Sequence, residues 1–167
     1  GVHADLDRVA PQLDVFLARA TKKLRRRRKS AEASFFETRG AAALGTFVER
    51  SGGLEGESEK LVEAWRDVGQ GDGVSKLGVH GLVAEALEAG LLAKGRAGYV
   101  VRPPQLGGAA LGRLVAEALE RGSPNVSALL ETCLLSSELW TALVAAAEAL
   151  DDQAPVLRAL DELSTGT

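Results

Sequence analysis

The stretch LVAEALEAG (residues 82–90) returns with one substitution as LVAEALERG (residues 114–122). A looser copy, LVAAAEALDD, begins at Leu143. Starting points about 30 residues apart are typical of stacked helix-turn-helix repeats, in which each hairpin buries its apolar face only against its neighbours. The copies therefore predict a short stack of helical hairpins. The alternative is that amphipathic helices rich in Ala, Leu and Glu resemble one another by chance.

The two closest copies also predict which residues face the core. Apolar side chains at the first, second, fifth and sixth positions recur at the spacing of one helix face. The pairs expected at equivalent core positions are Leu82/Leu114, Val83/Val115, Ala86/Ala118 and Leu87/Leu119.

Helical patterns cover most of the remaining sequence. Apolar stripes at helical spacing mark an N-terminal helix (Leu13, Phe16, Leu17, Ala20, Leu24), a middle helix (Leu61, Val62, Trp65) and a C-terminal helix (Leu157, Leu160, Leu163). Gly40 is expected to separate two further helices, and Ser30 and Ser58 are expected to cap the helices that follow them. The stretch LLAKGRAGYVVRPPQ (residues 91–105) is non-helical, because β-forming residues flank a glycine-containing turn and two prolines close it.

We therefore predict an all-α protein of stacked antiparallel helical hairpins, a short α-solenoid, with at most one small β-hairpin near residues 91–102. An N-terminal helix with a basic end is expected over residues 1–30, and a helical-repeat domain over residues 31–167. The expected helix content lies far above the one-third that is usual for globular proteins.

The composition is that of a folded chain with ordinary polarity. Of 167 residues, 46% are hydrophobic and 26% are charged, which is too apolar for disorder and long enough for one core. The net charge of −3 does not suit a protein that binds polyanions over its whole surface, so a nucleic-acid contact would need a local basic patch. The longest apolar stretch, Leu139 to Leu150, is too short to span a bilayer and predicts a buried helix, so no transmembrane segment is expected.

The segments AALGTFVERSGG, ESEKLVEAWRDVG and GVSKLGVHGLVAEALEAG resemble degenerate pentatricopeptide repeats, over residues 41–150. In such a repeat the first helix packs inside, and the second carries a stripe like Leu61, Trp65 and Val68. The stretch GRAGYVVRPPQ departs from the repeat pattern. The chain is also similar in mass and helical pattern to the pentatricopeptide-like accessory subunits on the catalytic head of euglenozoan mitochondrial ATP synthases. This resemblance implies a non-catalytic subunit that binds the outside of a larger one.

The sharpest local feature is KKLRRRRK (residues 22–29), which has seven cations in eight positions. The candidate contact residues for a partner or a phosphate are Lys22, Lys23, Arg25, Arg26, Arg27, Arg28 and Lys29. Four successive arginines occupy every face of a helical turn, so this end must project into solvent or onto a partner. Three functions are compatible with it: a nuclear import signal, a phosphate-backbone contact, or a dock for an acidic protein or anionic lipid. The alternative is a solvated helix end neutralised by acids around Asp14, Glu32 and Glu37.

The sequence predicts no catalytic, cofactor-binding or metal-binding residues, and hence no enzyme. No His or Cys pair has the spacing of metal ligands, and His3 lies near the chain end. His80 opens an amphipathic helix, where a surface or capping role is expected. Cys133 is the only cysteine, so no internal disulfide can form, and it is expected in the core. The loop GQGDGVSK (residues 69–76) lacks the Gly-Lys-Ser/Thr ending of a phosphate-binding loop and predicts a linker.

We expect a non-catalytic accessory or scaffold subunit that binds a larger protein of a multi-subunit assembly and needs no cofactor. The alternative is a nucleic-acid binder. In that case residues 74–103 would form the recognition helix and wing of a winged helix, with Lys94, Arg96 and Arg102 facing phosphates, or the helical repeats would bind RNA. A mitochondrial location is expected if a leader preceded Gly1, and a nuclear one if the arginine run is an import signal.

Overall fold

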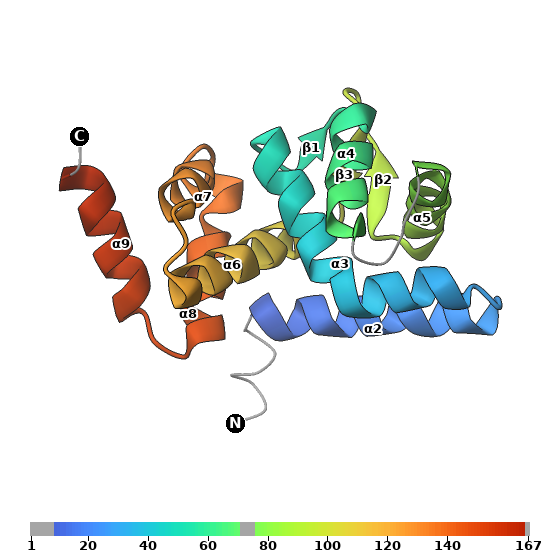
Figure 1. Ribbon diagram of the computed structural model, residues 1–167, viewed down its shortest axis with the longest axis horizontal. Helices are drawn as coiled ribbons and strands as arrows, with labels where there is room; N and C mark the ends of the chain where they lie inside the picture. Colours follow the sequence, from blue (N-terminus) through green and yellow to red (C-terminus); the bar gives the residue numbers. More distant parts are fainter. Residues whose placement is uncertain (1–8, 71–75, 166–167) are drawn as a thin grey trace.

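The computed structural model describes residues 9–70 and 76–165 and is 76% helical (Figure 1). Its elements in chain order are α2 (Val9–Arg26), α3 (Ser30–Ser51), β1 (Glu55–Gly56), α4 (Ser58–Val68), α5 (Lys76–Ala89), β2 (Leu92–Lys94), β3 (Tyr99–Val101), α6 (Pro104–Arg121), α7 (Val126–Cys133), the 3-10 helix η2 (Ser137–Leu139), α8 (Thr141–Leu150) and α9 (Ala154–Thr165). The predicted all-α class with a small hairpin is confirmed. A third strand of two residues, β1, joins the β2–β3 hairpin and was not predicted.

Helices α2 and α3 pack side by side as an antiparallel pair. The predicted apolar stripe of α2 is buried, except for Phe16, which is half-buried. The prediction that Gly40 separates two helices is wrong, because α3 runs through it without a break. A Cβ atom at Gly40 would lie 2.7 Å from Cδ2 of Leu17, so this glycine lets α2 approach α3 closely.

Three other local predictions need correction. The N-cap residues of α3 and α4 are Lys29 and Glu57, which make no side-chain capping hydrogen bond, so Ser30 and Ser58 are the first residues of their helices. In α9 the predicted stripe is wrong at its first position, because Leu157 is exposed. The residue before it is the buried one, since α9 packs against α7 and α8 with its face rotated by one position.

Helix α6 lies at the centre of the fold, between α3 and α8, and also contacts α2 and α7 (Figure 1). The small buried residues of its first half are Gly107, Gly108, Ala109, Ala110 and Gly112. A Cβ atom at Gly112 would lie 2.4 Å from the carbonyl oxygen of Ala142 in α8. One at Gly45 in α3 would lie 2.7 Å from the carbonyl oxygen of Ala110. Repeats of a solenoid contact only their neighbours in sequence. Helix α6 instead contacts both the N-terminal pair α2 and α3 and the C-terminal helices α7 and α8, so it links elements that a one-dimensional stack would keep apart.

Residues 30–101 have the topology of a winged helix. The elements follow in the order α3, β1, α4, α5, β2, β3, and β3 lies between β1 and β2 in an antiparallel sheet. Val100 of β3 is paired with Glu55 on one side and Ala93 on the other. Helix α4 is fixed to α3 by Trp65, whose Nε1 donates a hydrogen bond of 3.0 Å to the carbonyl oxygen of Ala43. Helix α5 and the hairpin therefore stand where a winged helix has its recognition helix and wing.

The repeated stretch ends three helices in the same way. The ninth residue of each copy, Gly90, Gly122 or Asp151, has a left-handed backbone with φ of 82°, 63° and 54°. The next N–H donates to the carbonyl five residues back, at 3.0, 2.9 and 3.1 Å, which is the Schellman arrangement. The second and fifth positions are buried in both close copies, but the first position differs, because Leu82 is buried and Leu114 is half-buried. The repeated stretch thus encodes an apolar helix face and the turn that ends the helix. The next element differs from copy to copy, being β2, α7 or α9.

Candidate interaction surfaces

The basic run of residues 22–29 covers the last turn of α2 and the turn into α3, at one end of the molecule's longest axis (Figure 1). All seven of its cationic side chains are exposed. The turn is closed by the N–H of Lys29, which donates to the carbonyl oxygen of Leu24 at 2.8 Å, and Arg28 between them has φ of 60°. The run is therefore exposed on the surface of the chain, as the sequence predicts for a helix end that projects into solvent or onto a partner.

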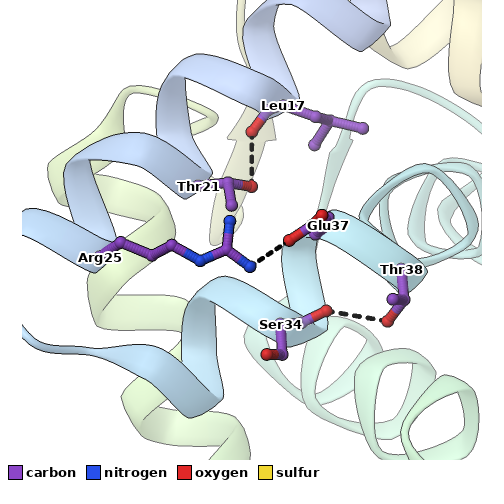
Figure 2. Close-up of polar contacts among 6 residues, drawn as sticks. All are labelled: Leu17, Thr21, Arg25, Ser34, Glu37 and Thr38. Atoms are coloured by element: carbon purple, nitrogen blue, oxygen red, sulfur yellow. Dashed lines mark hydrogen bonds and ion pairs between the residues drawn. The ribbon is translucent and has the colours of Figure 1, made fainter.

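Acidic residues of two other helices hold part of the run in place. Arg25 forms an ion pair with Glu37 of α3 (Figure 2). Nη1 of Arg27 lies 2.7 Å from Oε2 of Glu85 in α5, and Nζ of Lys29 lies 4.0 Å from the other oxygen of the same carboxylate. The side chain of Glu85 is only 11% exposed, so this largely buried carboxylate links the basic turn to α5.

The neutralising acids differ in part from those that the sequence indicates. Glu37 is one of the expected partners, but Asp14 pairs instead with Arg113 of α6, at 3.0 Å. Glu85 was not predicted, because it lies 58 positions from Arg27 and only the folded chain brings α5 to α2. Among the described residues, no ion pair involves the remaining cations of the run, Lys22, Lys23, Arg26 and Arg28.

A cleft of about 750 Å³ lies between α2, α3 and α6, beside the basic run. Its charged walls include the Arg25–Glu37 and Arg113–Asp14 pairs. The hydroxyls of Thr21 and Thr38 each donate to a carbonyl one turn earlier in their own helices, at 2.8 Å (Figure 2). Two of the cations that line the cleft are thus paired with acids and both hydroxyls are bonded within their helices, so we assign no ligand to this cleft.

Helix α5 and the wing present few groups that read bases. Over residues 78–89 of α5, where exposure is described, the exposed residues are Gly78, His80, Gly81, Ala84 and Glu88. Base edges are read chiefly by Arg, Lys, Asn and Gln, and none of these types occurs among those five residues. The cations suggested as phosphate contacts, Lys94, Arg96 and Arg102, are exposed on and beside the hairpin. Among residues 78–102, exposed positive charge therefore lies on and beside the hairpin and not on α5.

Histidine and cysteine are the residue types that most often act as catalysts or metal ligands, and neither His80 nor Cys133 lies in a cluster of such groups among the described residues. His80 is exposed, as expected, and lines a shallow cavity of about 350 Å³ with Glu59 and Glu63. Cys133 is fully buried, also as expected, and burial raises the pKa of its thiol to about 12. Across the described ranges, no three His, Cys, Asp or Glu side chains gather as metal ligands would. His3 and most of the glycine-rich loop lie outside the described residues.

The largest apolar side chains that remain in solvent belong mainly to the 134–144 segment, which joins α7 to α8 through η2. Its exposed members are Leu134 (46%), Leu135 (65%), Trp140 (57%) and Val144 (55%). Trp140 and Val144 are four residues apart on helical backbone, so they share a face of α8. Leu157 of α9 is also exposed. The segment lies away from the basic run, toward the other end of the molecule (Figure 1).

The prediction of a buried helix over residues 139–150 is therefore wrong in part. Leu139 is buried, but the other buried residues of this stretch are alanines that pack on α6, namely Ala142, Ala145 and Ala146. Glycine in α6 lets only small side chains fit between the two backbones, so the bulky residues of α8 point elsewhere. The mixture of Ala with bulky residues in this stretch was the sequence signal that could have indicated one tightly packed face and one exposed face.

Within residues 9–70 and 76–165, none of the helices combines the length and the hydrophobicity that a bilayer crossing requires. Comparisons with protein-family models, curated proteins and solved structures found no match to this chain. Function must therefore be argued from the surfaces themselves.

Proposed function

We propose that the protein is a non-catalytic accessory subunit that binds a larger protein of a multi-subunit assembly through the 134–144 segment. The observation that carries this proposal is the exposure of four large apolar side chains within eleven residues. Covering a half-exposed side chain of this kind is worth about 1 kcal/mol by area. Tryptophan is also a residue type in which binding energy concentrates, which makes Trp140 the expected anchor.

Two further features support a binding role over catalysis. The described titratable side chains form no metal-binding group, and the buried thiol of Cys133 is protonated at neutral pH because its pKa is about 12. The winged-helix region exposes Glu88 and His80 where base-reading side chains would stand, which suits a protein-binding use of this topology.

Co-purification from the native cells tests the proposal. The tagged chain should co-sediment with a stoichiometric larger complex, and the double substitution Trp140→Asp and Val144→Asp should release it. Both side chains are exposed, so this variant should keep the helicity and melting temperature of the parent chain. Val15→Asp with Ala84→Asp, at exposed positions of α2 and α5, adds the same charge elsewhere and is the matched control. A stable, unpartnered parent chain, or a double variant that stays in the complex, contradicts the proposal.

The catalytic head of a mitochondrial ATP synthase is the partner that the pentatricopeptide-like resemblance implies, and we propose it as the first assembly to examine. Fractionation of mitochondria followed by native gel electrophoresis should then place the chain with the enzyme's catalytic head. A nuclear fraction without ATP synthase subunits would instead favour the second candidate function.

That second candidate is nucleic-acid binding. It is favoured by the winged-helix topology together with the exposed cations of the α2–α3 turn. Because the exposed residues over 78–89 of α5 include no Arg, Lys, Asn or Gln, we expect the contacts to be with phosphates and to depend steeply on salt. Fluorescence anisotropy with duplex DNA and with RNA is the test.

The variant for this test replaces the four cations that have no acidic partner in the described chain, Lys22, Lys23, Arg26 and Arg28, with Gln. The slope of log affinity against log salt should fall by about 0.9 for each duplex phosphate that the variant no longer neutralises. Arg50→Gln with Arg66→Gln, on α3 and α4, is the control. Absence of binding at low salt removes this candidate.

A further inference from the structure

We infer that the partner at the 134–144 segment presents a basic amphipathic helix, with apolar side chains on one face and Lys or Arg beside them. This inference rests on the proposed function and specifies the partner's chemistry. Helices that bind in this way lay an apolar face on apolar residues, while charges at the edge select the partner and its orientation.

The charge around the segment is of one sign. Residues 123–157 contain no Lys, Arg or His, and their five acids are Glu131, Glu138, Glu148, Asp151 and Asp152. Glu131 is exposed one turn before Leu134 and Leu135, and Glu138 is exposed two residues before Trp140. The exposed apolar residues are thus flanked by carboxylates on their own elements.

Glu131 and Glu138, the two carboxylates nearest the exposed apolar residues in the sequence, have no ion-pair partner within the described ranges. Arg102 lines a cleft of about 730 Å³ together with Glu138, yet no ion pair joins the two among the described residues. The strongest cationic feature, the run of residues 22–29, lies at the opposite end of the long axis (Figure 1). An acidic and apolar surface of this kind complements a basic and apolar one.

A second copy of the chain is a poorer occupant. Its basic run has the charge, but the apolar stripe of the same helix, α2, is buried in its own fold. A second copy would therefore bring cations without the apolar stripe of their helix, or its own 134–144 segment, whose carboxylates would repel those of the first copy. The partner's helix must have both.

The experiment uses the full chain and two synthetic amphipathic peptides, one of Leu and Lys and one of Leu and Glu with the same pattern. Trp140 is 57% exposed and Trp65 is fully buried, so a blue shift of the tryptophan emission reports on Trp140. Affinity is measured by anisotropy of a labelled peptide, which also serves for a Trp140→Ala variant. The Leu/Lys peptide should bind and shift the emission, and the Leu/Glu peptide should not.

Two pairs of substitutions separate local charge from net charge. Glu131→Gln with Glu138→Gln should weaken Leu/Lys binding about tenfold at low salt, and Trp140→Ala should weaken it at least tenfold. Glu59→Gln with Glu63→Gln on α4 changes net charge equally and should leave the affinity unchanged. Circular dichroism checks that each variant is folded.

Four outcomes overturn the inference: no binding of the Leu/Lys peptide, equal binding of both peptides, equal weakening by both pairs of substitutions, or self-association that Trp140→Ala abolishes. The last outcome would assign the surface to a second copy. None of these outcomes changes the co-purification result. The proposed function is contradicted by a different observation, namely that the Trp140→Asp and Val144→Asp variant stays in the complex.

Discussion

Replacement of Gly112 by Ala tests the central position of α6 directly. The added Cβ would lie 2.4 Å from the carbonyl oxygen of Ala142, 2.6 Å from Cβ of Ala145 and 3.0 Å from the backbone nitrogen of Ala146. Carbon and oxygen normally approach to about 3.3 Å. Because all three neighbours belong to the backbone of α8 or are attached to it, no side chain can rotate away. Helices α6 and α8 must therefore separate by about 1 Å.

The expected magnitude follows from two opposing effects. Overpacking of a well-filled core costs about 1–3 kcal/mol, and the rigidity of these contacts places Gly112→Ala at the upper end. The higher helix propensity of Ala returns about 1 kcal/mol. We therefore expect a net loss of about 2 kcal/mol in the free energy of unfolding. For a chain of this size that corresponds to a fall in melting temperature of about 4–8 °C.

Gly81→Ala is the matched control. Gly81 lies in α5, and a Cβ atom there would meet nothing within 4 Å. Its substitution should raise the free energy of unfolding by about 0.5–1 kcal/mol, because only the propensity effect remains. Urea and thermal unfolding followed by circular dichroism measure both variants. A Gly112→Ala variant as stable as the parent chain would refute the close crossing of α6 and α8.

Three further predictions concern single side chains. Arg28→Gly should raise the free energy of unfolding by about 0.5–1 kcal/mol, since φ of 60° strains a residue with a Cβ; a lower urea midpoint would contradict this. Burial raises the pKa of the Cys133 thiol from 9.0 to about 12, so the unfolded chain loses this proton first and the free energy of unfolding falls as pH rises between these values. Cys133→Ala should remove up to about 1.4 kcal/mol per pH unit of that fall, and equal pH slopes for the two chains would refute the prediction. Glu85→Gln should lower the free energy of unfolding by about 1 kcal/mol at low salt and by less in about 1 M salt, because it removes the partner of Arg27. Glu88→Gln should leave it unchanged, and equal effects of the two variants in urea unfolding would count against the Glu85 contact.

The structure was predictable from the sequence where its cause is local. Helix stripes, the β2–β3 hairpin and the all-α class follow from residue patterns within one element. The repeated stretch proved to encode a Schellman ending at Gly90, Gly122 and Asp151, because that motif is complete within six consecutive residues. The exposure of the basic run also followed, since cations on every face of a turn cannot all be buried.

The candidate site was less predictable. Leu134, Leu135, Trp140 and Val144 are hydrophobic residues in apolar helices, and their composition alone assigns them to the core. The exposure of Trp140 and Val144 depends on α8 turning its alanines to α6, which in turn depends on the close approach at Gly112. The third strand was also missed, because β1 has two residues and pairs with β3 across two helices. The sequence offered a recognition helix and wing over residues 74–103 only as the alternative to helical repeats.

The sequence by itself determined that most segments are helical and which faces of α2 and α4 are buried, because hydrogen bonds and side-chain periodicity within a segment decide these. Only the tertiary structure decided that α6 lies at the centre, that Glu85 meets Arg27 from 58 positions away and that Trp140 faces solvent. The physical reason is that a helix face is buried by whichever distant segment packs against it, and that pairing is a property of the whole chain.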